Sequence, residues 1–195
     1  NKYFSVTRKE TAESAVLSCF DSAESMSYQQ LKEKLPYVPL AKIKQVLAQN
    51  NDFIWVNEGV YTHTSKIEVD RAERLTIERK IKAEITECGY VSIAAFDVSA
   101  SLELNPTLSE TAVKRGLFQI CLADRYEKRG NIITSKGAVL NTVAVFKDYC
   151  LSHEYLTLEE LLDLEKAIIG RNNSQSLFAA YDTMIRIDKH TFAAD

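Results

Sequence analysis

The chain has little of what prevents a protein from forming a packed core. Its 195 residues include six glycines and three prolines, with no biased tract, which excludes collagen-like, mucin-like and low-complexity classes. Uninterrupted apolar runs are short, far below the roughly 20 residues that a helix needs to cross a bilayer. Hydrophobic residues make up 46% of the chain and charged residues 26%, a composition typical of a folded globular protein. Because the chain starts at Asn1 rather than Met, we expect it to be part of a longer protein.

Metal-binding and redox motifs are also missing. The four cysteines are far apart and form no C-x-x-C pair: Cys19, Cys88, Cys121 and Cys150. The three histidines are equally scattered, so no zinc motif can be written from local spacing. We predict reduced, buried thiols in a cytoplasmic protein that holds no metal and no cofactor. Cys19, Cys88 and Cys150 fall near the ends of equivalent helical segments and are predicted to fill one repeated core position.

Catalytic signatures are likewise lacking. There is no G-x-S-x-G, glycine-rich phosphate loop or H-E-x-x-H. Cys150 lies between Asp148 and His153, which would suit a thiol and base pair, but no oxyanion site accompanies it. The sequence therefore predicts a protein without enzymatic activity and without a small-molecule substrate.

A short motif occurs three times: an apolar residue, Ser or Thr, an apolar residue, two others, and a final apolar residue. It starts at Met26, Val91 and Leu156. The serine or threonine suits a helix N-cap, and Gln30 and Glu160 complete capping boxes in the first and third copies. We predict three short helices that begin in the same way.

The segments around the three motifs have equivalent patterns. Helical periodicity precedes each motif at residues 12–20, 73–88 and 143–152, and follows it at 40–49, 110–123 and 174–181. A two-stranded hairpin is predicted at the end of each copy, over residues 53–62, 126–134 and 184–193. The pattern predicts a mainly α fold with small β-hairpins, in three tandem modules at residues 1–66, 67–136 and 137–195. The second copy has a longer connection over residues 97–107 and has diverged.

The order helix, capped helix, helix, hairpin resembles the winged helix-turn-helix module. The hairpin from Phe53 to Thr62 is also similar to those of the helix-turn-helix modules in bacterial RNA polymerase delta subunits and restriction-associated proteins. The resemblance implies that the third helix of a module enters the major groove while the hairpin, or wing, lies along the backbone or minor groove. We expect double-stranded DNA binding in the cytoplasm or bacterial nucleoid, by a transcriptional regulator or the recognition part of a DNA-processing or defence protein.

The outward faces of the third helices supply the candidate contacts. In the first module Leu40, Ile43 and Leu47 share an inward face, which leaves lysines and glutamines outward; these suit bases and phosphates, although they are also good solvated helix formers. In the third module a polar run opens the last helix, whose N-terminus would attract phosphate. The predicted DNA-binding residues are Lys42, Lys44, Gln45, Gln49, Lys114, Arg115, Lys128, Arg129, Arg171, Asn172, Gln175, Arg186 and Lys189.

The second module and the overall charge favour an alternative. Placing Val113, Leu117 and Ile120 inward turns Phe118 and Leu122 outward. Such an apolar stripe indicates a protein contact, with a neighbouring module, a partner protein or a second copy of the chain. The net charge is −3, and the third module has four more acidic than basic residues, so DNA binding would be weak or local. Four of those acids, Glu159, Glu160, Asp163 and Glu165, are predicted to face solvent or a protein. The alternative is a protein-interaction scaffold built from winged helices.

Overall fold

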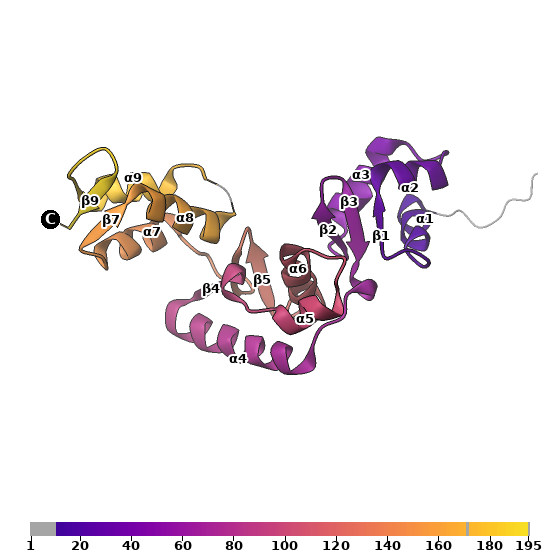
Figure 1. The fold of residues 1–195 in the computed structure, drawn as a ribbon, viewed down its shortest axis with the longest axis horizontal. Helices are drawn as coiled ribbons and strands as arrows, with labels where there is room; N and C mark the ends of the chain where they lie inside the picture. The colour runs from indigo at the N-terminus through magenta and orange to yellow at the C-terminus, as the bar shows by residue number, and fades with distance from the viewer. Residues whose placement is uncertain (1–10, 171, 195) are drawn as a thin grey trace, which may run out of the picture. The chain divides into compact units, whose positions relative to one another are not determined.

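A computed structural model describes residues 11–170 and 172–194 of the chain. Within these residues it contains nine α-helices, two short 3-10 helices and three small antiparallel sheets (Figure 1). The same order of elements occurs three times along the chain, which confirms the predicted mixture of helices and small hairpins. None of the helices in the described ranges has the length and apolar character of a membrane span.

The first copy has its elements close to the predicted positions. They are α1 (Ala12–Cys19), β1 (Ser25–Ser27), α2 (Tyr28–Lys34), α3 (Leu40–Gln49), β2 (Phe53–Asn57), β3 (Val60–His63) and η1 (Thr64–Lys66). The predicted capping box at Ser27 and Gln30 is confirmed. Gly59 forms the hairpin turn with a φ of +73°, a conformation that glycine adopts without strain.

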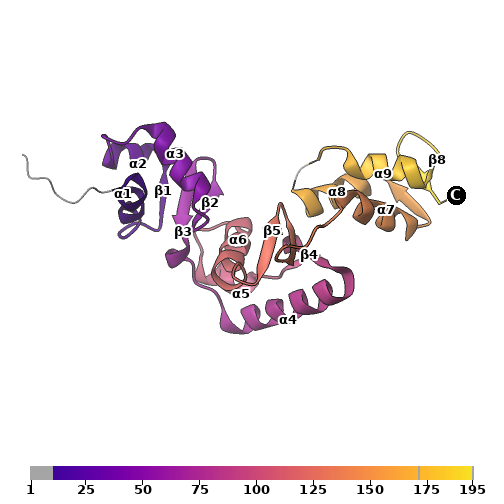
Figure 2. The ribbon, with the colours of Figure 1, turned by 180° about the vertical axis from the view of Figure 1, so that it is seen from behind.

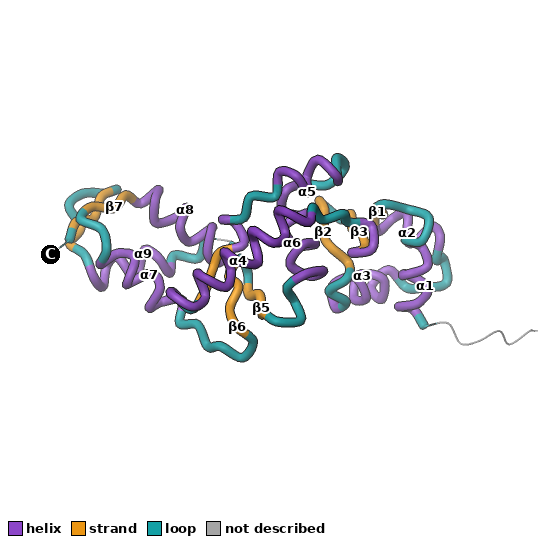
Figure 3. Tube along the Cα trace, turned by 90° about the horizontal axis from the view of Figure 1, so that it is seen from below, coloured by secondary structure: helices purple, strands orange, loops and turns teal. Residues whose placement is uncertain are grey.

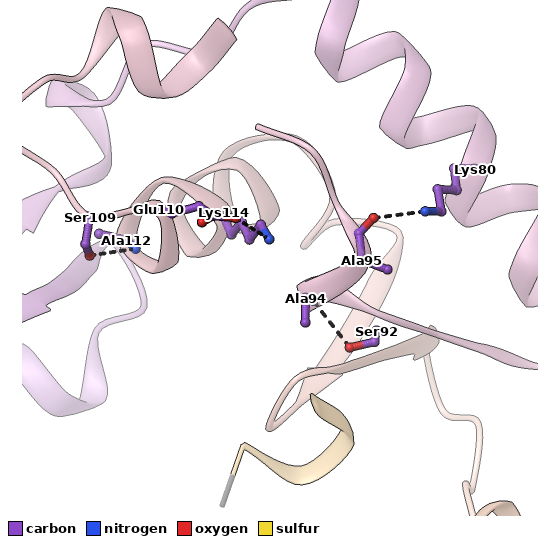
Figure 4. A network of polar contacts seen from close by, with 8 residues as sticks. All are labelled: Lys80, Ser92, Ala94, Ala95, Ser109, Glu110, Ala112 and Lys114. Atoms are coloured by element: carbon purple, nitrogen blue, oxygen red, sulfur yellow. Dashed lines mark hydrogen bonds and ion pairs between the residues drawn. The ribbon is translucent and has the colours of Figure 1, made fainter. Parts of the chain in front are cut away.

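The second copy departs from the others after its short strand. Its elements are α4 (Arg71–Cys88), β4 (Tyr90–Ser92), η2 (Ile93–Ala95), α5 (Ser99–Leu104), α6 (Glu110–Cys121), β5 (Tyr126–Arg129) and β6 (Ile132–Ser135). Ser92 caps only a single 3-10 turn, where a longer helix begins in the other copies (Figure 4). The helix α5 starts instead at Ser99, where Glu73 accepts bonds from the amides of Ala100 and Ser101, both at 3.0 Å.

The third copy returns to the first pattern. Its elements are α7 (Thr142–Leu151), β7 (Tyr155–Thr157), α8 (Leu158–Ile169), α9 (Gln175–Thr183), β8 (Ile185–Arg186) and β9 (Thr191–Ala193). The predicted capping box at Thr157 and Glu160 is confirmed. The sequence of the turn Asp188-Lys189-His190 favours a positive φ at Asp188, and this expectation is wrong, because the turn over residues 188–190 contains no positive φ.

Each sheet has three strands rather than the predicted two. The strand orders are β1-β3-β2, β4-β6-β5 and β7-β9-β8, so the last strand of each copy lies in the centre of its sheet. Figures 1 and 2 show this for the first sheet, where β3 lies beside β1 and β2. The additional strand has three residues and ends at the capping residue, Ser27, Ser92 or Thr157. It pairs with the central strand because the extended N-cap conformation continues directly from a strand.

The chain folds into two compact units. One contains residues 11–74 and 98–122, and the other contains residues 75–97 and 123–194, so the division runs through the predicted second module. The core of the first unit includes Phe20, Leu31, Ile43 and Leu47 beneath the inner face of the first sheet. The core of the second unit includes Phe146 of α7, Ala180 of α9 and Phe192 of β9. Helices α7 and α9 pack against each other (Figure 3).

Three thiols are buried, at Cys19, Cys121 and Cys150. Burial raises the pKa of Cys150, which keeps this group a neutral thiol and argues for a packing role. Cys88 is exposed, so the prediction that it fills a repeated core position is wrong. It is the last residue of α4 and is followed by Gly89, which turns the chain away with a φ of +80°.

Candidate nucleic-acid interface

Helix α3 and the turn before it form a polar surface of the first unit. The turn between α2 and α3 is closed by Lys32, whose Nζ donates to the carbonyls of Pro36 at 2.8 Å and Val38 at 2.9 Å. Burial of Ile43, Val46 and Leu47 then fixes the rotation of α3 about its axis. Leu40, which the periodicity placed in the core, is 40% exposed at the start of the helix.

All four residues predicted on the outer face of α3 are exposed: Lys42, Lys44, Gln45 and Gln49. Lys42 Nζ donates to Gln45 Oε1 at 3.1 Å, a surface bond that costs little to exchange for a ligand. The Lys44 ammonium lies 5.0 Å from the centre of the Tyr28 ring, a cation–π distance. Helix α3 therefore presents two cations and two amides that are accessible to solvent.

A polar cleft of about 540 Å³ runs beside this face, entirely within the first unit. Lys42 and Gln49 line it from α3, and Gln119 lines it from α6. The cleft also contains Glu13 and Asp52, which favour a ligand with hydrogen-bond donors over a free anion. Sequence reasoning missed Gln119 because it lies 70 positions after Gln49 and only the packing of α6 brings the two amides to one cleft.

The predicted phosphate contacts on α6 are engaged within the chain. Lys114 forms an ion pair with Glu110 at 2.7 Å, and only 11% of its side chain is exposed (Figure 4). The Arg115 guanidinium lies 5.6 Å from the ring centre of Trp55 on β2. Both cations therefore stabilise packing at the surface of the first unit.

The predicted exposure of Phe118 and Leu122 is wrong. Both side chains are buried, while Ile120, which was placed inward, is exposed. Val113 and Leu117 are buried as predicted, but the buried stripe of α6 extends to Phe118 and is therefore wider than one side of a surface helix. These two residues cannot form the predicted protein-interaction surface.

The basic residues of the second hairpin make local contacts. Arg129 donates through Nε and Nη2 to the same Glu127 oxygen, at 3.0 and 2.9 Å, and this bonding lowers the pKa of Glu127. Lys128 Nζ donates to the Gly130 carbonyl at 3.1 Å. Arg129 remains exposed, but its charge is compensated by the neighbouring carboxylate.

The turn of this hairpin is attached to α8 within the second unit. The backbone N–H of Asn131 donates to the Ile168 carbonyl at 3.3 Å, and the Asn131 side-chain Nδ2 donates to the Lys166 carbonyl at 3.3 Å. A Cβ on Gly130 would lie 2.6 Å from the Ile169 carbonyl oxygen, so glycine is needed for this close approach. These bonds satisfy carbonyls at the end of α8 and hold the turn of the second hairpin against that helix.

The predicted phosphate site at the start of α9 is already filled by a carboxylate of the same chain. Glu165 is fully buried and accepts hydrogen bonds from the amides of Ser174 at 3.1 Å and Gln175 at 2.6 Å, as well as from Ser176 Oγ at 3.5 Å. The prediction that Glu165 faces solvent and that these amides await phosphate is therefore wrong. A buried carboxylate at a helix N-terminus supplies the charge that an anionic ligand would bring.

The remaining predicted residues of the third copy are scattered. Gln175 is half-buried and its Oε1 accepts a bond from Thr142 Oγ1 at 3.3 Å, whereas Asn172 and Lys189 are exposed. Arg186 donates to the Asp188 carbonyl at 2.8 Å. Arg171 lies outside the described residues.

No protein-family model and no curated protein sequence matches the chain. Within the described ranges, no three His, Cys, Asp or Glu side chains gather into a group that could hold a metal ion. The chemistry of the exposed α3 face is thus the basis for a functional interpretation.

Proposed function

We propose that the chain is a tandem winged helix-turn-helix protein that binds double-stranded DNA through helix α3 of its first copy. The observation that carries this proposal is the α3 face itself, where Lys42, Lys44, Gln45 and Gln49 are all exposed. Gln can form two hydrogen bonds with adenine in the major groove, and Lys binds guanine or phosphate. A regulator or the recognition part of a DNA-processing protein would use such a face.

Local charge supports this placement despite the net charge of −3. Residues 28–50, which contain α2, the turn and α3, include four lysines and a single acidic residue, Glu33. Since phosphate contacts supply most of the non-specific affinity for DNA, this segment is the favourable place for a duplex to approach. Five of the other predicted cations make contacts within the chain: Lys114 with Glu110, Arg115 with the Trp55 ring, Lys128 with the Gly130 carbonyl, Arg129 with Glu127 and Arg186 with the Asp188 carbonyl. In this proposal the second and third copies therefore serve mainly as a scaffold.

Fluorescence anisotropy with a random duplex of about 30 base pairs, from low to physiological salt, tests the proposal. The double substitution Lys42→Glu and Lys44→Glu should weaken binding by about 100-fold and lower the slope of log affinity against log salt by about two, because two phosphate or base contacts are lost.

The matched control is Arg79→Glu with Lys82→Glu, the same charge change at two exposed positions of α4. It should leave the affinity within about threefold, because it alters only the long-range field of the protein. Absence of duplex binding at low salt, or an equal loss in both double variants, would overturn the proposal.

A protein-interaction scaffold is the second candidate function. It is favoured by the exposed large apolar side chains of the third copy, which include Phe178 and Tyr181 on the outward face of α9. An aromatic face at this position suits a protein partner better than a major groove. This candidate would be favoured if the Lys42→Glu, Lys44→Glu variant lost no duplex binding and still bound a partner protein.

A further inference from the structure

Each of the three sheets has an inner face toward its own helices and an outer face. Side chains alternate along a strand, so the pairing register assigns each residue to one face. In the third sheet Leu156, Phe192 and Arg186 lie in one row, and Tyr155, Ala193 and Ile185 lie in the next row on the opposite face. Leu156 and Phe192 belong to the core, which makes the row of Tyr155 the outer face.

The outer face of the first sheet is covered by the segment that follows it in the chain. Ile54 and Val56 pack with Ile67 and with Ala112 of α6, and Leu108 borders the same cluster. Ser109 at the start of α6 also donates to the Val56 carbonyl at 3.3 Å. The cover is thus a helix start with small and aliphatic side chains, followed in α6 by the cations Lys114 and Arg115, of which Arg115 lies over the ring of Trp55 on β2.

The outer face of the second sheet is covered in a similar way. Ile132 belongs to the core of the third copy and Tyr90 packs against that core. Ser92 Oγ donates to the Ala167 carbonyl of α8 at 3.0 Å. Again a helix end with an aliphatic residue, here Ile168, lies over the sheet.

The equivalent face of the third sheet has no such cover within the described residues. Tyr155 is 59% exposed and Ile185 is 52% exposed, and Ile187 beyond the strand is also exposed. Ile185 and Ala193 are paired in the third sheet as Ile54 and Thr62 are paired in the first. In the first sheet both side chains are buried. The outer row is therefore covered in the first and second sheets and accessible to solvent in the third.

The rim of this face is acidic. Glu154 precedes Tyr155, Glu160 bonds to Thr157 at the end of β7, and Asp188 lies in the hairpin turn. All three carboxyls are exposed, and backbone hydrogen bonds lower the pKa of Glu160 and Asp188, so both stay ionised at neutral pH. Lys189 is the one lysine or arginine in this hairpin turn.

We propose that the outer face of the third sheet, formed by Tyr155, Ile185 and Ala193, docks an amphipathic helix of a partner protein. The two covered sheets define the apolar side of that helix as small and aliphatic, and the acidic rim selects lysine or arginine along its flank. This surface lies on the third copy and goes beyond DNA binding by α3, so either proposal can fail without the other.

The test uses the full chain and a fluorescent peptide with the sequence of residues 106–122, with serine in place of Cys121. This peptide carries the features of the cover of the first sheet: Leu108, Ala112, Lys114 and Arg115. It should bind the chain with micromolar affinity that weakens with salt, and a peptide with Lys114→Glu and Arg115→Glu should bind at least tenfold more weakly.

The variant Ile185→Lys should weaken binding of the peptide at least tenfold, because it removes apolar area and repels the basic flank. Tyr155→Ser should weaken it as well, and the exposed α7 residue Leu151 provides the matched control Leu151→Lys, which should leave binding unchanged. Unchanged far-UV circular dichroism would establish that each variant is folded.

Two results would overturn the proposal. One is absence of peptide binding, or binding that Ile185→Lys leaves unaffected. The other is a dimer in sedimentation velocity that Ile185→Lys converts to a monomer, since the occupant would then be a second copy of the chain.

Discussion

Helices α3 and α9 hold the same place in the repeated order of elements, but they offer different chemistry. Helix α3 follows Pro39, has no side-chain cap and exposes cations and amides, including Lys42 and Gln45. Helix α9 has its first amides bonded to Glu165 and exposes Phe178, which is 64% accessible. A repeated order of elements thus fixes the local architecture, while the side chains of each copy decide what it can bind.

The two helices also differ in what surrounds them. Lysines outnumber acids around α3, whereas α8, which supplies the cap of α9, carries Glu159, Glu160 and Asp163 on its exposed side. The lysines of α2 and α3 favour the approach of a duplex, whereas the exposed carboxylates of α8 repel it. The comparison predicts a chain with one end suited to nucleic acid and the other suited to protein.

Of the substitutions that test the difference between α3 and α9, removal of the Glu165 cap of α9 should have the largest effect, which is on stability. Glu165→Ala leaves the amides of Ser174 and Gln175 without their acceptor, at a cost of about 3 kcal/mol in unfolding free energy. Hydrogen exchange of the α9 amides should accelerate accordingly, while exchange in α3 should not change, because the two helices lie in different units.

The control for this prediction is Glu159→Ala on the exposed side of the same helix, which should change stability by less than about 0.5 kcal/mol. Glu165→Gln, which retains one acceptor oxygen, should fall between the two. Unaltered exchange of α9 in Glu165→Ala would mean that the start of this helix is as open as that of α3, and the comparison would fail.

Local signals made most of the fold predictable. The capping boxes at Ser27 and Thr157 connect residues three positions apart, so the sequence pattern contains the whole interaction. Gly59 and Gly130 mark their turns in the same way. The short strands β1, β4 and β7 could not be predicted, because three residues are too few for an alternating pattern and their partners are distant in sequence.

The residues of the candidate site were predictable only where the helical periodicity of the sequence alone determines which side chains are exposed, as in α3. Glu165 resembles its exposed acidic neighbours in sequence, and its burial depends on the following loop, where Ser174 adopts a φ of +67° and turns two amides toward the carboxylate. Phe118 looked outward because the packing of α6 involves more than one of its sides. Tertiary contacts, which leave no periodic signal, determined both outcomes.

Substitution of the two α3 glutamines that would contact bases should have a smaller effect than removal of the α9 cap. Gln45→Ala with Gln49→Ala should reduce discrimination between a preferred duplex and a random one by about tenfold, since a two-bond contact to a base contributes about 1–3 kcal/mol. Affinity for the random duplex should stay within about twofold because the lysines remain.

The equivalent change in the third copy sharpens this test. Gln175→Ala should leave discrimination unchanged, since the Gln175 side chain contacts Thr142 rather than solvent alone. A selected preferred sequence and anisotropy titrations at one salt concentration provide the measurement. Equal losses from α3 and α9 would show that both helices read DNA and would remove the distinction between them.

The smallest effect concerns a tyrosine pair that supports α3 and has no counterpart below α9. Burial, followed by the hydrogen bond with Tyr28, raises the pKa of Tyr61 from its ordinary value of 10.0 to about 12, and the two hydroxyl oxygens lie 3.0 Å apart. The equivalent positions of the third copy are Leu158 and Phe192, which do not titrate.

Because the pKa of Tyr61 is higher in the folded than in the unfolded chain, its contribution to stability is complete below pH 10 and is lost as the pH rises toward 12. Tyr28→Phe should lower the pKa of Tyr61 toward the value set by burial alone, with little effect at neutral pH. Absorbance at about 295 nm, which reports tyrosinate, should therefore rise earlier in a pH titration of this variant. A titration curve that differs only by the loss of one ordinary tyrosine would show that the pair does not couple, and that the support of α3 is purely apolar like that of α9.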